Sequence, residues 1–227
     1  MIVLCIAFIH SNLVAQEADK STHAISGGGY VHIGMDFIDM PSLGNSLNQY
    51  GLPEFGAQER ITFGGGGGAF INRVYFGGYG EGHAGLSASN GLYKAKIYGG
   101  QGLVQVGYKL MENEFFALYP TFGAGGGGTA MRIKEGPAYA ESVQGGLLQP
   151  DSRIHAGYML LMFELNNDFY IGPNKHTAGS FLLGIAAGYQ LAPWVSRWKY
   201  DNRSLPELDK YDPSGFYLRL KLGWASD

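Results

Sequence analysis

The last part of the chain alternates apolar and polar residues without interruption. Large apolar residues occupy every second position: Phe216, Leu218, Leu220, Leu222 and Trp224. The positions between them include Arg219 and Lys221. Successive side chains of a β-strand point to opposite faces of a sheet, so a period of two predicts a strand with one apolar and one polar face. Alternation alone does not say which of the two faces points outward.

Segments of the same kind recur through the chain. Residues 30–37 carry apolar side chains at Val31 and Ile33 and polar ones at His32 and Asp36, and residues 101–110 repeat the pattern. The sequence therefore predicts eight strands, at residues 25–38, 59–71, 73–86, 93–110, 115–131, 154–166, 179–191 and 214–224. A length of 227 residues suits a single β domain.

The connections between these segments differ in length. Short ones are expected at 72–73, at 111–114 and from 166 onward, and long ones at 39–58, 132–153 and 192–213; the link at 87–92 is short although it lies on the long-loop side. After residue 16 no run approaches the roughly 20 apolar residues of a transmembrane helix. A closed β-barrel is the other structure in which all backbone N–H and C=O groups can form hydrogen bonds within a lipid bilayer. We predict an all-β fold: an up-and-down antiparallel transmembrane β-barrel of about eight strands with long extracellular loops.

Residues 1–16 have the pattern of a secretory signal peptide. An apolar run from Ile2 to Ile9 precedes polar residues and the small Ala15, which predicts cleavage near Ala15 or Gln16. The alternative is a buried strand or core segment. An export signal assigns residues 17–227 to the barrel domain and the protein to the outer membrane. Cys5 lies within the predicted signal peptide and would be removed with it, so the mature chain would have no cysteine for a disulfide or a thiolate metal site.

Composition agrees with a wall that is apolar on one side and polar on the other. Charged residues make up 15% of the chain, against about 25% in a typical soluble domain, and the mean hydropathy is -0.06. The net charge of -3 gives no basic footprint for nucleic acid. Glycine runs at 64–68 and 125–128 fall inside predicted strands. We interpret these glycine runs as strand positions that allow strong curvature and leave room for large inward side chains, and not as flexible linkers.

Aromatic residues gather near the expected ends of the strands. Near the short turns lie Tyr108, Phe115, Phe116, Phe169, Tyr170 and Trp224. Near the long loops lie Tyr93, Tyr189, Trp194 and Trp198. Two such bands predict the aromatic girdles that a membrane barrel places at the two bilayer interfaces.

Three stretches carry a resemblance to a known family. They are the export ending Val14-Ala15-Gln16, the hairpin from Gly64 to Gly78 around Phe70-Ile71-Asn72-Arg73, and the closing stretch from Gly215 to Trp224. In these features the chain resembles the small outer-membrane β-barrel proteins of the Bacteroidetes type. The resemblance implies a barrel in the outer membrane and a last strand that the barrel-insertion machinery reads, although three residues follow the terminal aromatic residue here. It implies no activity.

Seven ionisable residues are expected to face the barrel interior: His32, Asp36, Glu81, His83, Glu164, Arg219 and Lys221. Side chains just fill the interior of a barrel of about eight strands, so we interpret these residues as a packed polar network and expect no pore. The histidines, including His155, lack the spacing of a metal site, and no cofactor is expected. Residues 80–85 match a dinucleotide-binding glycine spacing, but no helix is predicted after them, as the phosphate site requires.

We predict an outer-membrane barrel that acts as a structural or surface-interaction module, with no catalysis assigned. One alternative is a lipid A-modifying, deacylase-like enzyme that uses His83 with Ser87 or Ser89 and Glu81. Lipid A deacylases resemble the chain in size and strand number, but their His-x-Ser-Asn pattern is not reproduced here. A second alternative is a soluble, lipocalin-like barrel that binds an apolar ligand.

Two long loops hold candidate contact residues. Residues 42–55 predict a short helix capped by Ser42 and stopped by Gly51. Its leucines, Leu43 and Leu47, share a face that packs on the barrel rim or contacts a partner. The second loop mixes aromatic and cationic residues: Trp194, Arg197, Trp198 and Lys199. These suit the aromatic girdle or the phosphates of lipopolysaccharide. The expected partners are outer-membrane lipid, lipopolysaccharide and a surface protein of unknown identity.

Overall fold

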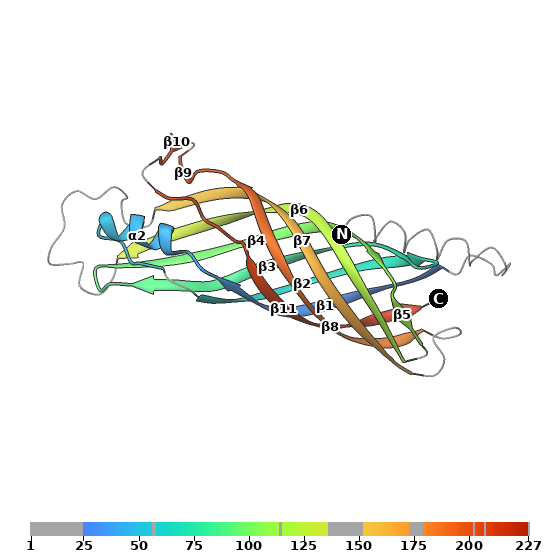
Figure 1. The fold of residues 1–227 in the computed structure, drawn as a ribbon. Coiled ribbons are helices and arrows are strands. Elements are labelled where there is room, and N and C mark those ends of the chain that lie inside the picture. Colours follow the sequence, from blue (N-terminus) through green and yellow to red (C-terminus); the bar gives the residue numbers. More distant parts are fainter. Residues whose placement is uncertain are drawn as a thin grey trace.

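Eight long strands wind around one axis in the computed structural model (Figure 1). The structure describes residues 25–55, 58–113, 115–135, 152–172, 179–201, 203–206 and 208–226. The predicted signal peptide and the Val14-Ala15-Gln16 ending lie outside these residues. Helix α2 and the small strands β9 and β10 lie at one end of the barrel, which we call the mouth, and β5 lies with the C-terminus at the other, which we call the turn end.

The strands form a closed antiparallel sheet in chain order. The wall consists of β1 (Ile25–Ile38), β2 (Gln58–Ile71), β3 (Val74–Ser89), β4 (Tyr93–Tyr108), β6 (Phe116–Glu135), β7 (Arg153–Ile171), β8 (Ser180–Val195) and β11 (Gly215–Ser226). Each strand pairs with the next, and β11 pairs with β1 from Gly215↔Ile38 to Ser226↔Gly27, which closes the ring. The predicted eight-stranded up-and-down barrel is confirmed.

Strands β3, β6, β7 and β8 extend at least three residues beyond their predicted ends, and the pairing of β6 with β7 shows this most clearly. This pairing runs from Phe116↔Phe169 to Arg132↔Arg153, so β6 and β7 reach beyond the predicted 115–131 and 154–166. Backbone hydrogen bonds continue this ladder where the side-chain pattern is less regular. Three short strands, β5 (Met111–Glu112), β9 (Lys199–Tyr200) and β10 (Arg203–Ser204), were not predicted and lie in the connections.

The apolar face of the wall points outward in the middle of the barrel. On β11, Phe216 is 67% exposed and Leu220 is 48% exposed, whereas Arg219 and Lys221 are each 2% exposed. The remaining strands also carry large exposed apolar residues, among them Val31, Phe63, Val104, Phe163 and Ile185. An apolar exterior around a polar interior is the arrangement of a membrane-spanning barrel. It is the reverse of the soluble lipocalin-like alternative, whose apolar side chains would line a cavity.

Glycines leave room for the inward side chains of neighbouring strands. A Cβ on Gly66 would lie 2.6 Å from the Cβ of Tyr79, and one on Gly127 would lie 2.7 Å from the Tyr158 hydroxyl. A Cβ atom does not come this close to another heavy atom, so these positions exclude larger residues. Both glycine runs therefore belong to the strands β2 and β6 and make room for tyrosines.

The predicted aromatic bands need correction at three positions. At the turn end Tyr108, Phe115, Phe169 and Trp224 are exposed, and near the mouth Tyr189 and Trp194 are exposed. Tyr93 and Trp198 are instead buried, and Tyr170 packs against the buried aromatic cluster at the turn end. Sequence position gave the height of these residues, but strand parity and loop folding decided which side they face.

Helix α2 (Pro41–Gln49) begins one residue before the predicted cap. Pro41 occupies the first turn after Met40, and no side chain caps the helix, so the prediction of Ser42 as N-cap is wrong. A proline at this position fits because the first backbone N–H groups of a helix have no internal partner. The predicted stop holds: Gly51 has φ +69, a conformation that favours glycine, and its N–H donates to the Asn48 carbonyl. Among the described residues, no helix is long and apolar enough to cross a membrane.

Candidate functional site

Arg219 is the centre of a buried polar network in the barrel interior, here called the lumen network. Its Nε and Nη2 donate to the two carboxylate oxygens of Glu81, both at 3.0 Å, and Nη1 donates to Glu164 at 2.8 Å. Nη2 also donates to the Tyr79 hydroxyl at 2.8 Å. The guanidinium carbon lies 4.0 Å from the centre of the Tyr217 ring. A planar guanidinium suits this two-sided arrangement of carboxylates and rings.

Further side chains complete the coordination of the two glutamates. The His32 Nε2 atom lies 3.0 Å from Glu81, and the Gln101 amide donates to Glu81 at 2.6 Å. The Gln105 amide donates to Glu164 at 3.2 Å. These groups come from β1, β4 and β7 as well as from β3 and β11, so the network connects opposite walls of the barrel. A lumen crossed in this way is filled with side chains.

Lys221 forms a second ion pair nearer the turn end. Its Nζ lies 2.5 Å from an oxygen of Asp168 and donates to Asn166 at 2.8 Å. The Tyr119 hydroxyl donates to the other Asp168 oxygen at 2.6 Å. A small apolar cluster lies next to this pair, toward the turn end, and consists of Phe70, Tyr75, Ala117 and Tyr119. Aromatic rings therefore close the lumen at the turn end.

A third ion pair lies within the barrel wall near the mouth, and a hydrogen bond connects it to the loop that follows β10. Arg60 pairs with Asp36, and its Nη1 donates to the Tyr211 hydroxyl at 2.5 Å. Tyr211 lies outside the strands, and burial raises the pKa of its hydroxyl. These contacts hold the loop inside the mouth. Nothing in the local sequence around Tyr211 predicted this, because its partner is 151 positions away.

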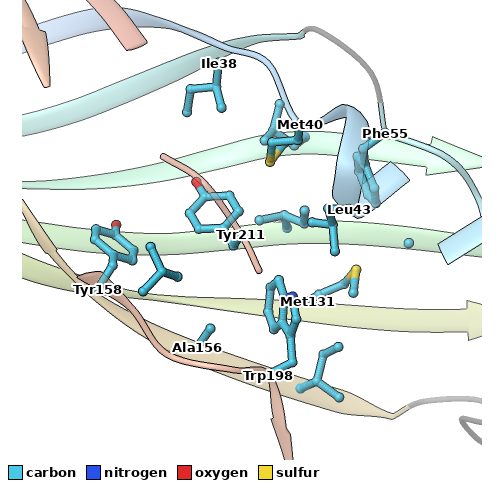
Figure 2. Close-up of a cluster of buried hydrophobic side chains, with 14 of the residues drawn as sticks. Ile38, Met40, Leu43, Phe55, Met131, Ala156, Tyr158, Trp198 and Tyr211 are labelled. Atoms are coloured by element: carbon cyan, nitrogen blue, oxygen red, sulfur yellow. The ribbon is translucent and has the colours of Figure 1, made fainter. Parts of the chain in front are cut away.

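An apolar cluster fills the mouth, here called the mouth plug. Figure 2 shows Leu43 of α2, Phe55, Met131 of β6, Trp198 and Tyr211 gathered in one cluster. Leu43, Leu47, Phe55 and Trp198 are all at most 1% exposed. The Trp198 indole donates to the Asp209 carbonyl at 3.0 Å, and the Asp209 N–H donates to Ser46 of α2 at 3.2 Å. Two loops are thus packed together into one lid.

The polarity of the wall reverses between mid-barrel and mouth. In the middle, charged side chains face inward and apolar ones face outward. At the mouth end of β4 and β6, the inward residues are apolar, including Ala95, Ile97 and Ile133, while Lys94 and Lys96 face outward. Apolar groups are placed outward where lipid surrounds the protein and inward where water does. The reversal therefore marks the height at which the bilayer ends.

The buried charges balance one another. The buried cations are Arg60, Lys109, Arg219 and Lys221, and the buried carboxylates are Asp36, Glu81, Glu164 and Asp168. Lys109 pairs with Glu112 at 2.8 Å and lies 4.2 Å from the Phe70 ring centre, and the other three cations pair within the barrel. Paired and hydrogen-bonded charges are tolerated away from water, whereas an unpaired one is costly.

The seven residues predicted for the interior all lie there. His32, Glu81, Glu164 and Arg219 join the lumen network, whereas Asp36 and Lys221 belong to the other two ion pairs. His83 is buried, and its ring nitrogens have no hydrogen-bond partner within the described part of the chain. Sequence reasoning missed Arg60 and Asp168. Asp168 has the same strand parity as Glu164 on β7, and Arg60 alternates with the apolar Ile61 on β2.

The predicted contact residues divide into two groups. Leu43, Leu47 and Trp198 are buried in the mouth plug, so the helix packs its leucines against the barrel and these side chains are not exposed for a partner. Trp194, Arg197 and Lys199 remain exposed. An amphipathic helix gives the same sequence pattern whether a partner or its own barrel covers the apolar face.

The residues proposed for a deacylase-like enzyme do not converge. His83 points into the lumen, while Ser87 and Ser89 are exposed on the outer side of β3. A bulge between Ala84 and Leu86 shifts the register in this part of the strand. Since a nucleophile and its base must be within hydrogen-bonding distance, these residues form no catalytic pair. Among the described residues, no group of three or more potential metal ligands occurs either.

The similarity of this chain to known proteins is confined to solved structures. No protein-family model matches the chain, and no curated protein is similar to it in sequence. Similar solved structures include the attachment invasion locus protein Ail of Yersinia pestis, alone and in complex with the heparin analogue sucrose octasulfate. Each is 12% identical, the matches cover 90% of this chain and 99% of the other, and the TM-scores are 0.45 and 0.49. The architecture of this chain is defined by its strand pairing and by the polarity of its wall, which are those of an eight-stranded antiparallel barrel of the membrane-spanning kind.

Proposed function

We propose that the chain is an exported outer-membrane barrel, of the small Bacteroidetes type that it resembles, which acts as a structural and surface-interaction module without catalysis. Under this proposal residues 1–16 are removed as a signal peptide and residues 17–227 form the mature barrel. The observation that carries the proposal is the combination of an apolar outer wall with a lumen filled by Arg219, Glu81 and Glu164. A filled lumen offers no path for solutes.

The surface that remains for interactions is the mouth and the wall around it. The mouth plug supports a rigid lid, because it ties α2 to the loop around Trp198 and Tyr211. Trp194, Arg197 and Lys199 are exposed beside this lid and are our candidates for contacts with lipopolysaccharide or a surface protein. Cations and aromatic rings at a membrane interface favour phosphorylated headgroups.

Membrane fractionation combined with a heat-modifiability gel tests the assignment. The mature protein is expected to sediment with the outer membrane and to migrate faster before boiling than after, because a closed barrel stays compact in detergent. In planar bilayers the folded protein is expected to give no steady ion conductance. Recovery from the soluble periplasmic fraction, or a stable open channel, would refute the proposal.

A further inference from the structure

A cluster of cations covers one patch of the outer wall near the mouth, here called the basic patch. Its residues line a shallow hollow on the outer face of three adjoining strands and are Lys94, Lys96, Tyr98, Arg132, Lys134 and Arg153. They come from β4, β6 and β7. The patch contains five of the 16 Lys and Arg residues of a chain whose net charge is -3. Such a concentration needs a physical reason.

The strand register places like charges directly opposite one another. Lys94 pairs with Lys134, Lys96 pairs with Arg132, and Arg132 pairs with Arg153 on the next strand. Side chains at such positions have Cβ atoms only about 5 Å apart, and like charges there are destabilising. Within the described part of the chain, Lys94, Lys96, Lys134 and Arg153 form no ion pair with a carboxylate. Among the described residues these four cations have no carboxylate to offset their mutual repulsion, whereas a ligand with several negative charges would offset it.

The patch lies at the height where the wall changes from apolar to polar on its outer side. Its inward neighbours on the same strands, Ala95, Ile97 and Ile133, are fully buried in the mouth plug. Tyr98 is half-buried at the lower edge, a position typical of an interfacial tyrosine. The cations therefore point sideways into the headgroup layer of the bilayer rather than upward into the medium.

The wall below the patch is flat. The outward positions that follow Tyr98 on β4 are Gly100 and Gly102, and Gly126 and Gly128 lie opposite them on β6. Farther down, the exposed apolar side chains resume at Val104 and, on β6, Phe122. A strip without side chains lets an acyl chain lie close against the backbone, directly beneath the cations. A soluble polyanion or a protein partner would have no use for that strip.

We propose that the basic patch binds the phosphates of a phosphorylated glycolipid of the outer leaflet, lipid A, whose acyl chains lie over the glycine strip of β4 and β6. The inference rests on the proposed outer-membrane location and goes beyond it, since it places the main contact with the lipid phosphates on the side wall, in addition to the candidate contacts of the loop with Arg197 and Lys199. Lysine and arginine donate charge-assisted hydrogen bonds to phosphate, and each cation near an anionic membrane surface contributes about 1 kcal/mol.

The test compares the folded full-length mature protein with the triple variant K94Q/K96Q/K134Q in lipid nanodiscs. The probe is bis-phosphorylated, hexa-acylated lipid A, and the same lipid without phosphates is the second probe. Removing three cations is expected to weaken binding of the phosphorylated probe by about 100-fold, which is about 3 kcal/mol at 1.4 kcal/mol per factor of ten. The dephosphorylated probe is expected to bind both proteins equally and weakly.

Matched variants identify the site. R73Q/K210Q removes two exposed cations away from the patch and is expected to bind like the wild type. R197Q/K199Q alters the candidate contacts of the mouth loop and is expected to weaken binding clearly less than the triple variant does. Each variant must show wild-type heat modifiability, which reports the fold separately from lipid binding.

Wild-type affinity in the triple variant would overturn the inference, as would a loss of binding confined to R197Q/K199Q. A soluble sulfated oligosaccharide that bound the wild type as tightly as lipid A would also overturn the assignment to a lipid. None of these results would affect the outer-membrane assignment, which the fractionation experiment decides independently.

Discussion

Replacing Arg219 by methionine should destabilise the barrel strongly, and removing the charges of its partners should restore most of the loss. Arg219→Met keeps a long side chain of comparable bulk, but it removes two hydrogen bonds to Glu81, one to Glu164 and one to Tyr79. Two carboxylates then remain buried without their cation. Breaking a buried ion pair in this way costs about 3–5 kcal/mol.

The partner substitutions separate lost packing from unpaired charge. In the triple variant R219M/E81Q/E164Q the neutral amides keep hydrogen-bonding capacity toward Gln101 and Gln105, and no charge is left unpaired. We expect this variant to lie within about 1.5 kcal/mol of the wild type, because a buried ion pair can be replaced by neutral groups at little cost. The triple variant is therefore expected to be more stable than R219M by at least about 1.5 kcal/mol.

Urea unfolding of the protein refolded into detergent micelles or bilayers measures these free energies, with tryptophan fluorescence and the heat-modifiability gel as two readouts. R73M, at the exposed β2–β3 turn, is the control for the arginine-to-methionine exchange and should change stability by less than about 0.5 kcal/mol. If R219M and the triple variant were equally unstable, the cost would come from lost packing alone, and the account of the lumen network as a balanced set of charges would be wrong.

Three further predictions concern the wall, the lid and the lipid face. Gly66→Ala should lower the free energy of unfolding by about 1–3 kcal/mol, because the added Cβ would lie 2.6 Å from Tyr79. Gly80→Ala is the control: its Cβ would have its nearest contact at 3.8 Å, and it should cost less than about 0.5 kcal/mol. Equal losses of the two variants in urea titrations would contradict this reasoning. Tyr211→Phe should loosen the mouth by about 1.5–3 kcal/mol through loss of the bond from Arg60, seen as faster proteolysis of the loop around Tyr211. Burial raises the pKa of Tyr211 above its ordinary value near 10, so its contribution to the free energy of unfolding is complete below pH 10 and falls as the pH rises beyond it. The loss of stability at alkaline pH should therefore be smaller in the phenylalanine variant. Leu220→Arg on the lipid face should cost about 2–4 kcal/mol in bilayers, while Ser87→Arg near the mouth is tolerated; equal assembly of the two variants would argue against a bilayer around Leu220.

The sequence by itself determined the strands and the two faces of each. A period of two is visible within a single strand, so residues 216–224 and 30–37 could be assigned from neighbours in the chain alone. The even strand number and the alternation of short and long connections then predicted the barrel. The same alternation within β2 places Arg60 on the face opposite Ile61, and within β7 it places Asp168 on the face of Glu164, so these two could have been found by extending the same argument.

Only the tertiary structure decided which side of the wall is apolar and which residues meet. Alternation is symmetric between inside and outside, so closure of β1 on β11 was needed to place Arg219 beside Glu81 and Glu164. The helix around Leu43 and Leu47 has an apolar face that the sequence cannot assign to a partner or to the barrel. The basic patch arises because β4, β6 and β7 lie side by side in one register, bringing together cations as far apart in sequence as Lys94 and Arg153. Contacts between distant segments depend on strand pairing and register, which no local pattern encodes.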